Sequence, residues 1–299
     1  GAAINLATTS GDINLNGNST TSFGGYGIFF NSTGNSRGVN VSTETGDITL
    51  RGDSVGTSDA IALGGSTGNG TASNRITSKG GDISLNGNFH SPNAGELDHG
   101  IAILSVNNLI QTTGNGNVTL TGSARDLGSG IEVYGNGKAQ LSVENGALTL
   151  NGSSGAGDGI GLLTGQNSLR ATGSGSVTLN GTSDTASGIN IFPSGSSSAV
   201  TISTLSGELS LTGTAGPASS APGISIRSGA SGAGNGVKIL KGTALGSGAG
   251  VAIGATNARG FNTLQSGGNL NLTGRSTSGA ALSFDSGTNT LQVADGILR

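Results

Sequence analysis

The sequence predicts an all-β fold, a right-handed parallel β-helix (a three-sided β-solenoid) of about nine coils with 29–35 residues each. Three observations lead to this prediction. A glycine is followed six residues later by a second glycine in nine places, alternating apolar pairs recur in phase with these motifs, and aromatic residues make up only 3% of the 299 residues. The motifs begin at Gly11, Gly46, Gly81, Gly116, Gly146, Gly175, Gly207, Gly236 and Gly268.

The first strand of each repeat lies inside the glycine motif. In GDINLNG, Ile13 and Leu15 alternate with polar neighbours, which is the period of a half-buried strand. The same apolar pair recurs in the other copies, except in the eighth, where Lys238 takes an apolar position. We expect nine equivalent strands that form one side of the coil.

A second strand follows each motif, and a third, weaker one precedes the next. The second is an alternating pair such as Ile61/Leu63, present in every repeat, and the third is a pair such as Val39/Val41. Propeller blades need four strands and longer repeats, and hairpins usually carry a constant tight turn. Three short strands per repeat therefore favour stacked coils about 4.8 Å apart.

The composition fits a narrow solenoid. We expect the 59 glycines to supply corner φ values that other residues resist, and aligned Asn and Thr to hydrogen-bond along the outside. A net charge of -3, only 4 prolines and the regular apolar phase argue against disorder. Without cysteine there is no disulfide or thiolate metal site. Residues 1–299 are interpreted as a single β-solenoid fragment of a longer exoprotein.

Tandem strands such as GDITLRG and GDISLNG, in a cysteine-free chain rich in Gly, Ser, Thr and Asn, resemble the β-helical stalk of filamentous-haemagglutinin-type adhesins of two-partner secretion and of related autotransporter passengers. The resemblance covers the whole chain and departs from the family in its longer repeat. It implies a structural and adhesive stalk segment of a large secreted protein on the bacterial outer surface, which mediates attachment, biofilm formation or aggregation.

The partners implied by this resemblance are a host-cell receptor, a neighbouring bacterial cell or a matrix polysaccharide, and a dedicated outer-membrane transporter for the full-length protein. We expect a monomeric rod without cofactor, enzymatic activity or nucleic-acid partner. Two alternatives stay open. One is a polysaccharide-degrading or polysaccharide-binding β-helix protein such as a lyase, a glycosidase or a tailspike-like protein, and the other is an ice- or mineral-binding solenoid with a flat face of repeated Thr.

Two motifs are candidate binding sites on the coil itself. Arg51-Gly52-Asp53 is a tripeptide that integrins recognise, although its place at the second motif glycine predicts a coil corner. Asp12, Asp47 and Asp82 occupy the same position in three successive coils and form a weak calcium candidate. The alternative for these three is that each carboxylate accepts a backbone N–H at a turn.

The richest cluster of chemically active residues lies in the loop before Ile101, with Glu96, Asp98 and His99. Carboxylates from the following coils could approach this loop, which makes it the best candidate for a groove. The alternative is a solvated insertion. Those carboxylates are Asp126, Glu132 and Asp158.

The sequence also contains several Asn-x-Ser/Thr triplets, which a repeat of this composition produces by chance and which are also candidate glycosylation sites. They begin at Asn18, Asn31, Asn40, Asn69, Asn117, Asn151, Asn180 and Asn271.

Overall fold

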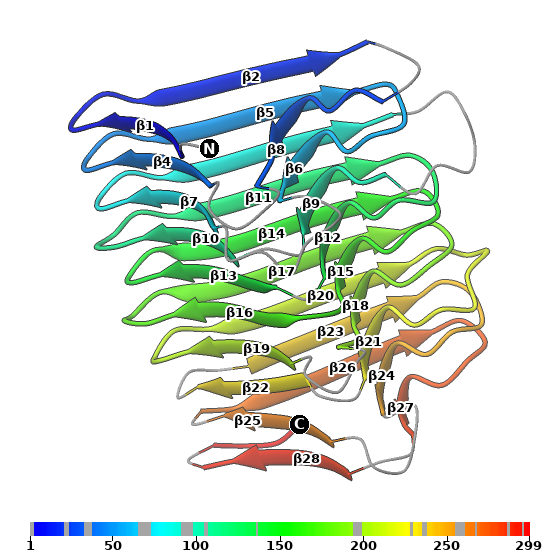
Figure 1. Ribbon diagram of the computed structural model, residues 1–299. Coiled ribbons are helices and arrows are strands. Elements are labelled where there is room, and N and C mark those ends of the chain that lie inside the picture. Colours follow the sequence, from blue (N-terminus) through cyan, green and yellow to red (C-terminus); the bar gives the residue numbers. More distant parts are fainter. Residues whose placement is uncertain are drawn as a thin grey trace.

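The computed structural model is a parallel β-solenoid built from three sheets (Figure 1). No helix in the described part of the chain could span a membrane. The structure describes residues 3–20, 24–32, 38–64, 73–90, 98–104, 107–135, 137–193, 199–227, 230–234, 238–254, 261–266, 268–285, 288–294 and 296–299.

Each sheet collects one strand from each coil. Sheet A consists of β1 (Ile4–Thr8), β4 (Val39–Thr43), β7 (Ser73–Ser78), β10 (Asn107–Thr112), β13 (Lys138–Val143), β16 (Gln166–Ala171), β19 (Ala199–Thr204), β22 (Ala230–Gly234), β25 (Phe261–Ser266) and β28 (Thr288–Val293). Sheet B consists of β2 (Ile13–Ser19), β5 (Ile48–Ser54), β8 (Ile83–Phe89), β11 (Val118–Ala124), β14 (Ala147–Ser154), β17 (Ser176–Ser183), β20 (Leu209–Ala215), β23 (Lys238–Ala244) and β26 (Leu270–Ser276). Sheet C consists of β3 (Ile28–Phe30), β6 (Ile61–Leu63), β9 (Ile101–Leu104), β12 (Ile131–Tyr134), β15 (Ile160–Leu162), β18 (Ile189–Ile191), β21 (Ile224–Arg227), β24 (Val251–Gly254) and β27 (Leu282–Phe284).

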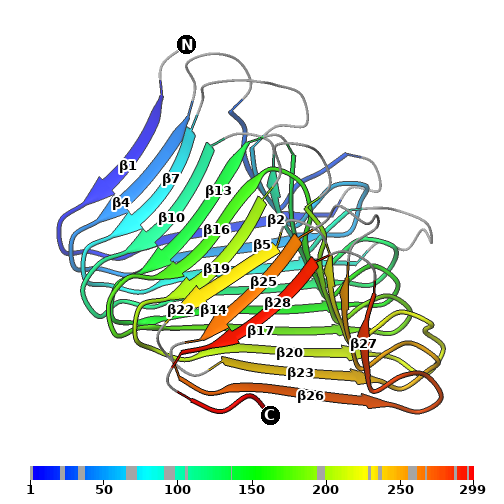
Figure 2. The same ribbon diagram turned by 90° about the horizontal axis from the view of Figure 1, so that it is seen from below.

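Every strand pairs in parallel with the equivalent strand of the next coil. Ile13 pairs with Ile48, and Ile48 pairs with Ile83, so the apolar residues of the motif stack in columns. Seen from below, the sheets lie on three sides of one coil axis (Figure 2). The predicted three-sided parallel fold is confirmed, and each of the nine strands of sheet B contains the second glycine of one motif.

The columns of Ile, Leu and Val form one continuous core. Ile48, Leu50, Ile83 and Leu85 are completely or almost completely buried, and the same cluster extends to Leu270. Burial of one such side chain contributes about 1.5–3 kcal/mol. Since each coil packs mainly on its neighbours, stability is distributed along the stack.

Sheet A was only partly predicted, because some of its inward positions carry asparagine. Asn74 and Asn108 are buried, and the Asn74 amide donates to Asn108 Oδ1 at 3.1 Å. The Asn108 amide in turn donates to the backbone oxygen of Leu104 at 2.9 Å. These amides satisfy backbone groups between sheets C and A, so a polar residue at an inward position does not interrupt the strand.

The motif glycines are required because the backbone of a neighbouring segment approaches them closely, and the predicted requirement for special φ values is wrong at these positions. A Cβ on Gly122 would lie 2.0 Å from the backbone oxygen of Gly130, where sheets B and C meet. A Cβ on Gly81 would lie 2.0 Å from the backbone oxygen of Gly46 in the preceding coil. Among the described residues the positive-φ glycines are Gly24, Gly64, Gly114, Gly135 and Gly165, and these lie outside the motifs.

We predict that Gly122→Ala destabilises the protein by about 3 kcal/mol or more, because the new methyl group overlaps a backbone oxygen that cannot move without displacing sheet C. Gly80→Ala is the matched control, since its Cβ would have Glu44 O as nearest neighbour at 3.6 Å, an ordinary contact. Chemical denaturation followed by circular dichroism measures both. Equal denaturation midpoints for the two variants would contradict this account of the motif.

Candidate functional site

A group of ionisable side chains gathers where the chain enters sheet C. Asp59, His99 and Asp158 each lie two residues before the first isoleucine of a sheet C strand. Backbone hydrogen bonds from Ala60 N to His99 O (3.0 Å) and from Gly130 N to Asp158 O (3.0 Å) hold these positions in register. Stacking therefore brings residues far apart in the sequence into one column. We call Asp59, His99, Glu132 and Asp158 the acidic cluster.

Short hydrogen bonds connect the first three members of the acidic cluster. The His99 backbone N–H donates to Asp59 Oδ1 at 2.7 Å. The Ser129 N–H donates to His99 Nδ1 at 2.9 Å, while the Ser129 hydroxyl donates to Glu132 Oε2 at 2.7 Å. Because Nδ1 accepts a hydrogen bond, the imidazole carries its proton on Nε2. The 3.5 Å contact between His99 Nδ1 and Glu132 Oε2 therefore joins two acceptors and is not an ion pair at neutral pH.

Burial sets the protonation states of this group. It raises the pKa of Asp59 to about 7, and the nearby Asp98 and Glu132 charges add to this, although the hydrogen bond from His99 opposes it. Burial lowers the pKa of His99 to about 4. It also raises the pKa of Glu132, against the hydrogen bond from Ser129. At neutral pH the His99 imidazole is therefore neutral, and Asp59, which accepts the His99 backbone N–H, is partly protonated.

Asp158 is held by donors from the next coil. Its Oδ1 accepts the Ser187 N–H at 3.1 Å, and its Oδ2 accepts the Asn190 amide at 2.8 Å. Burial raises the pKa of Asp158 in spite of these two hydrogen bonds. Each carboxyl group of the acidic cluster therefore already has a donor from the protein.

Aromatic rings flank the acidic cluster on the outer side of sheet C. Tyr134 meets the His99 ring edge-on, with centroids 6.0 Å apart, and Tyr26 stacks on Phe29 at 4.3 Å. Burial, together with the surrounding carboxylates, raises the pKa of Tyr134 to about 12. Carboxyl groups beside aromatic rings can bind the hydroxyls and the apolar faces of a sugar ring.

The structure brings together some of the residues that the sequence placed at the expected groove. His99 and Glu132 are in contact, and Asp158 lies in the same column as His99. Asp98 lies close enough for its charge to raise the pKa of Asp59. Glu96 lies outside the described residues. Asp126 is not among the groups whose charges or hydrogen bonds act on the acidic cluster.

Sequence reasoning missed Asp59 and Tyr134. Asp59 precedes Ile61 by two residues, as His99 precedes Ile101, so alignment of the second strands could have found it. Tyr134 could not be found in this way, because its contact with His99 depends on how two neighbouring coils stack.

The tripeptide Arg51-Gly52-Asp53 lies in the interior of strand β5, whereas the sequence had predicted a corner. Both neighbouring strands pair with it, through Asn16 and Asn86 at Arg51. Gly52 is buried, and Asp53 Oδ1 accepts the Asn88 amide at 3.1 Å. The tripeptide is therefore extended along a flat sheet and does not project from a loop.

Asp12, Asp47 and Asp82 form a ladder of hydrogen bonds between coils. Asp12 Oδ1 accepts the Asp47 N–H at 2.9 Å, and Asp47 Oδ1 accepts the Asp82 N–H at 2.8 Å. Asp82 accepts the Asn117 N–H, and Asn117 takes over the same role for Ala147. Among the described residues no group of three or more His, Cys, Asp or Glu side chains is arranged to hold a metal ion. The geometry matches the backbone-acceptor alternative.

Comparison with protein-family models, with curated proteins and with solved structures finds no match for this chain. The class of protein is defined by its fold, which is that of a parallel β-solenoid repeat protein.

We predict that Asp47→Ala destabilises the protein by about 1 kcal/mol, because the Asp82 N–H loses its acceptor. Asp47→Asn should stay within about 0.5 kcal/mol of the wild type, since Asn117 already performs this role with an amide oxygen. Thermal unfolding with and without calcium measures both effects. A calcium-dependent rise in the melting temperature that Asp47→Asn abolishes would show instead that the aspartates form a metal site.

The pH dependence of stability should identify Asp59. Its folded pKa of about 7 lies above the ordinary value of 3.8, so its contribution is complete below about pH 4 and is lost as the pH rises to about 7. Asp59→Asn keeps an acceptor for the His99 N–H without titrating. The variant should therefore gain stability relative to the wild type across this range, on the order of 4 kcal/mol.

The control for this experiment is Asp53→Asn on sheet B, the same change of residue outside the acidic cluster. His99 acts in the opposite sense, because its lowered pKa of about 4 contributes stability above pH 6.5 that is lost on acidification. Denaturation midpoints measured from pH 4 to 8 separate the two groups. Parallel profiles for the wild type and Asp59→Asn would contradict the assignment.

Proposed function

We propose that this chain is a structural and adhesive rod segment of a large secreted bacterial surface adhesin, which mediates attachment or aggregation. The observation that carries the proposal is the unbroken register of the coils, in which each strand pairs with its equivalent along all three sheets. Nine strands spaced about 4.8 Å apart extend over roughly 40 Å. Such a repeat provides length and a continuous lateral surface.

The polar rows on the outside support this role. Asn180 donates to Asn151 Oδ1 at 3.0 Å, and Ser123 donates to Asn88 Oδ1 at 2.6 Å, so exposed side chains hydrogen-bond from coil to coil. Rows of this kind keep the surface hydrated while they hold it rigid. The partners that we propose are a host-cell receptor, a neighbouring bacterial cell or a matrix polysaccharide. The full-length protein would reach the cell surface through a dedicated outer-membrane transporter.

The acidic cluster favours a second candidate function, the processing of a polysaccharide. Glycoside hydrolysis uses a pair of carboxyl groups, one of them with a raised pKa. Asp59 and Glu132 both have raised pKa values, and Tyr134 lies beside them. The hydrogen bonds that occupy these carboxyl groups support binding more than turnover, so we keep adhesion as the first proposal.

A glycan array combined with a lyase and hydrolase screen on the purified protein tests the two functions. We expect binding without turnover. Glu132→Gln is the diagnostic variant for catalysis, and Glu144→Gln, an exposed carboxylate on the side of sheet A, is its control. Turnover that Glu132→Gln lowers at least about a hundredfold and Glu144→Gln leaves unchanged would replace adhesion by the enzymatic function.

A further inference from the structure

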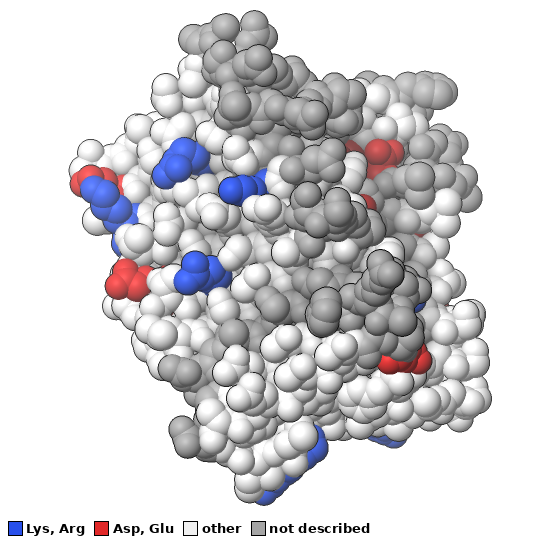
Figure 3. Space-filling model, turned by 60° about the horizontal axis from the view of Figure 1, so that its bottom comes forward, with Lys and Arg blue, Asp and Glu red and all other residues white. Residues whose placement is uncertain are grey.

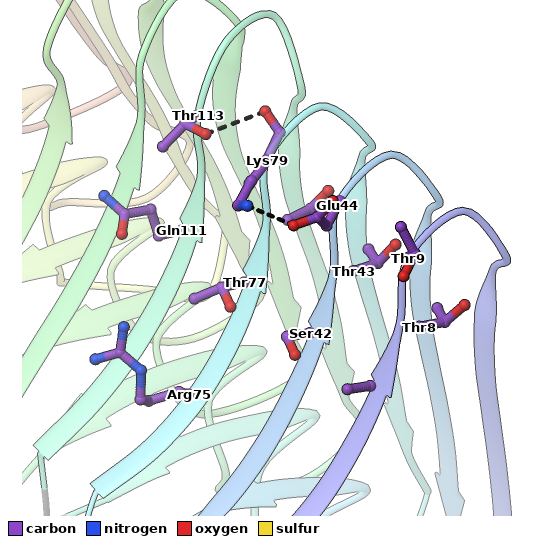
Figure 4. A pocket seen from close by; sticks show the side chains of 12 residues that line it. Thr8, Thr9, Ser42, Thr43, Glu44, Arg75, Thr77, Lys79, Gln111 and Thr113 are labelled. Carbon is purple, nitrogen blue, oxygen red and sulfur yellow. Dashed lines mark hydrogen bonds and ion pairs between the residues drawn. The ribbon is translucent and has the colours of Figure 1, made fainter.

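A second feature of the surface lies on the outer face of sheet A, away from the acidic cluster. It is a hollow of about 450 Å³ across strands β1, β4, β7 and β10 (Figure 4). This volume is within the range of small-ligand sites. We call it the sheet A hollow, and its lining includes Ser42, Thr77, Arg75, Gln111, Glu44 and Lys79.

The hollow exists because a column of small side chains lies between longer ones. Ala7, Ser42 and Thr77 are register partners on successive strands and form its floor. Gln111 is the next residue of this column and closes the floor with a long amide side chain. Figure 4 shows Arg75 on one side of the floor and Lys79 with Glu44 on the other. The result is a furrow with hydroxyl groups on its floor and charged groups on both sides.

The two cations that line the hollow differ in their polar contacts. Lys79 Nζ forms an ion pair with Glu44 Oε1. Within the described part of the chain, the Arg75 guanidinium makes no hydrogen bond or ion pair, although it carries five N–H donors. An exposed guanidinium beside a furrow matches a carboxylate or sulfate on a ligand.

The charge of the whole face supports an anionic ligand. Sheet A carries the exposed cations Arg75, Lys138 and Arg170 within its strands, whereas Lys79 and the exposed acids Glu44 and Glu144 each lie one residue beyond the end of a strand. Figure 3 shows several separate Lys and Arg side chains on this face of the molecule, with Asp or Glu side chains at its left edge. The chain as a whole has a net charge of -3, so this local excess of positive charge is not a property of its overall composition.

We propose that the sheet A hollow binds an acidic sugar unit of a polysaccharide, a ring that carries a carboxylate or a sulfate. Arg75 binds the acidic group, Ser42 and Thr77 hydrogen-bond to ring hydroxyls from the floor, and Gln111 and Glu44 fix the orientation of the ring. The inference rests on the proposed adhesive function, for which it names the class of ligand.

Binding of three matched polymers at physiological salt tests the proposal: neutral dextran, carboxymethyl dextran and dextran sulfate. We expect binding of at least one acidic polymer and none of neutral dextran. Arg75→Gln should weaken the acidic interaction about tenfold or more, because a charge-assisted hydrogen bond is lost. Thr77→Trp should weaken it by a similar factor by filling the furrow without any change in charge. The two acidic polymers distinguish a carboxylate from a sulfate as the group recognised.

Two control variants separate a specific site from general attraction. Arg51→Gln removes an exposed charge from sheet B, and Arg170→Gln removes one from sheet A outside the hollow. Each should weaken binding by less than about threefold. If all three arginine variants weaken binding equally, or if Thr77→Trp has no effect, the hollow is not the site although glycan binding stands. If none of the three polymers is bound, this inference is overturned, whereas the adhesive function, which also admits a host-cell receptor or a neighbouring cell as partner, is decided separately by the glycan array.

Discussion

The close stacking of equivalent coils is the constraint on which the rest of this structure depends. Parallel strands about 4.8 Å apart bring each backbone into contact with the one below it, and sheets B and C approach each other closely inside each coil. At Gly81 and Gly122 a Cβ would lie 2.0 Å from a backbone oxygen. The repeated glycines therefore mark the places where the cross-section of the coil leaves no room for a side chain. The column of apolar residues beside them supplies the burial that holds the stack together.

Because the coils stack, the side chains at each position of the repeat form a column along the solenoid. The chemistry of these side chains decides whether the column stabilises or destabilises the fold. Asp12, Asp47 and Asp82 avoid mutual repulsion because each carboxylate accepts a backbone N–H of the next coil. Asn74 and Asn108 solve the corresponding problem inside the coil, where amides satisfy buried backbone groups. In both cases a polar side chain supplies the hydrogen-bond partner that a backbone group would otherwise lack.

The two lateral faces with distinctive chemistry differ in how their charges are held. On the side of sheet C, Asp59 is buried and Glu132 is half-buried, and both are hydrogen-bonded, so their protonation is coupled to folding. On the face of sheet A, Arg75 is exposed beside an open furrow. The first arrangement resembles a preorganised network, and the second leaves its donors available to a ligand. A solenoid can carry both, because its lateral faces point in different directions.

The sequence by itself determined the repeat, the three strands in most coils, the inward Ile and Leu columns and the alignment of Asp12 with Asp47 and Asp82. All of these follow from periodicity, since residues at the same phase of a repeat must stack. Only the tertiary structure decided why the motif glycines are needed, that Asn74 lies inside, that Arg51-Gly52-Asp53 lies within a strand, and that Tyr134 meets His99. These features depend on the cross-section of the coil, which sets how close different sheets and corners come. The periodicity of the sequence carries no information about that cross-section.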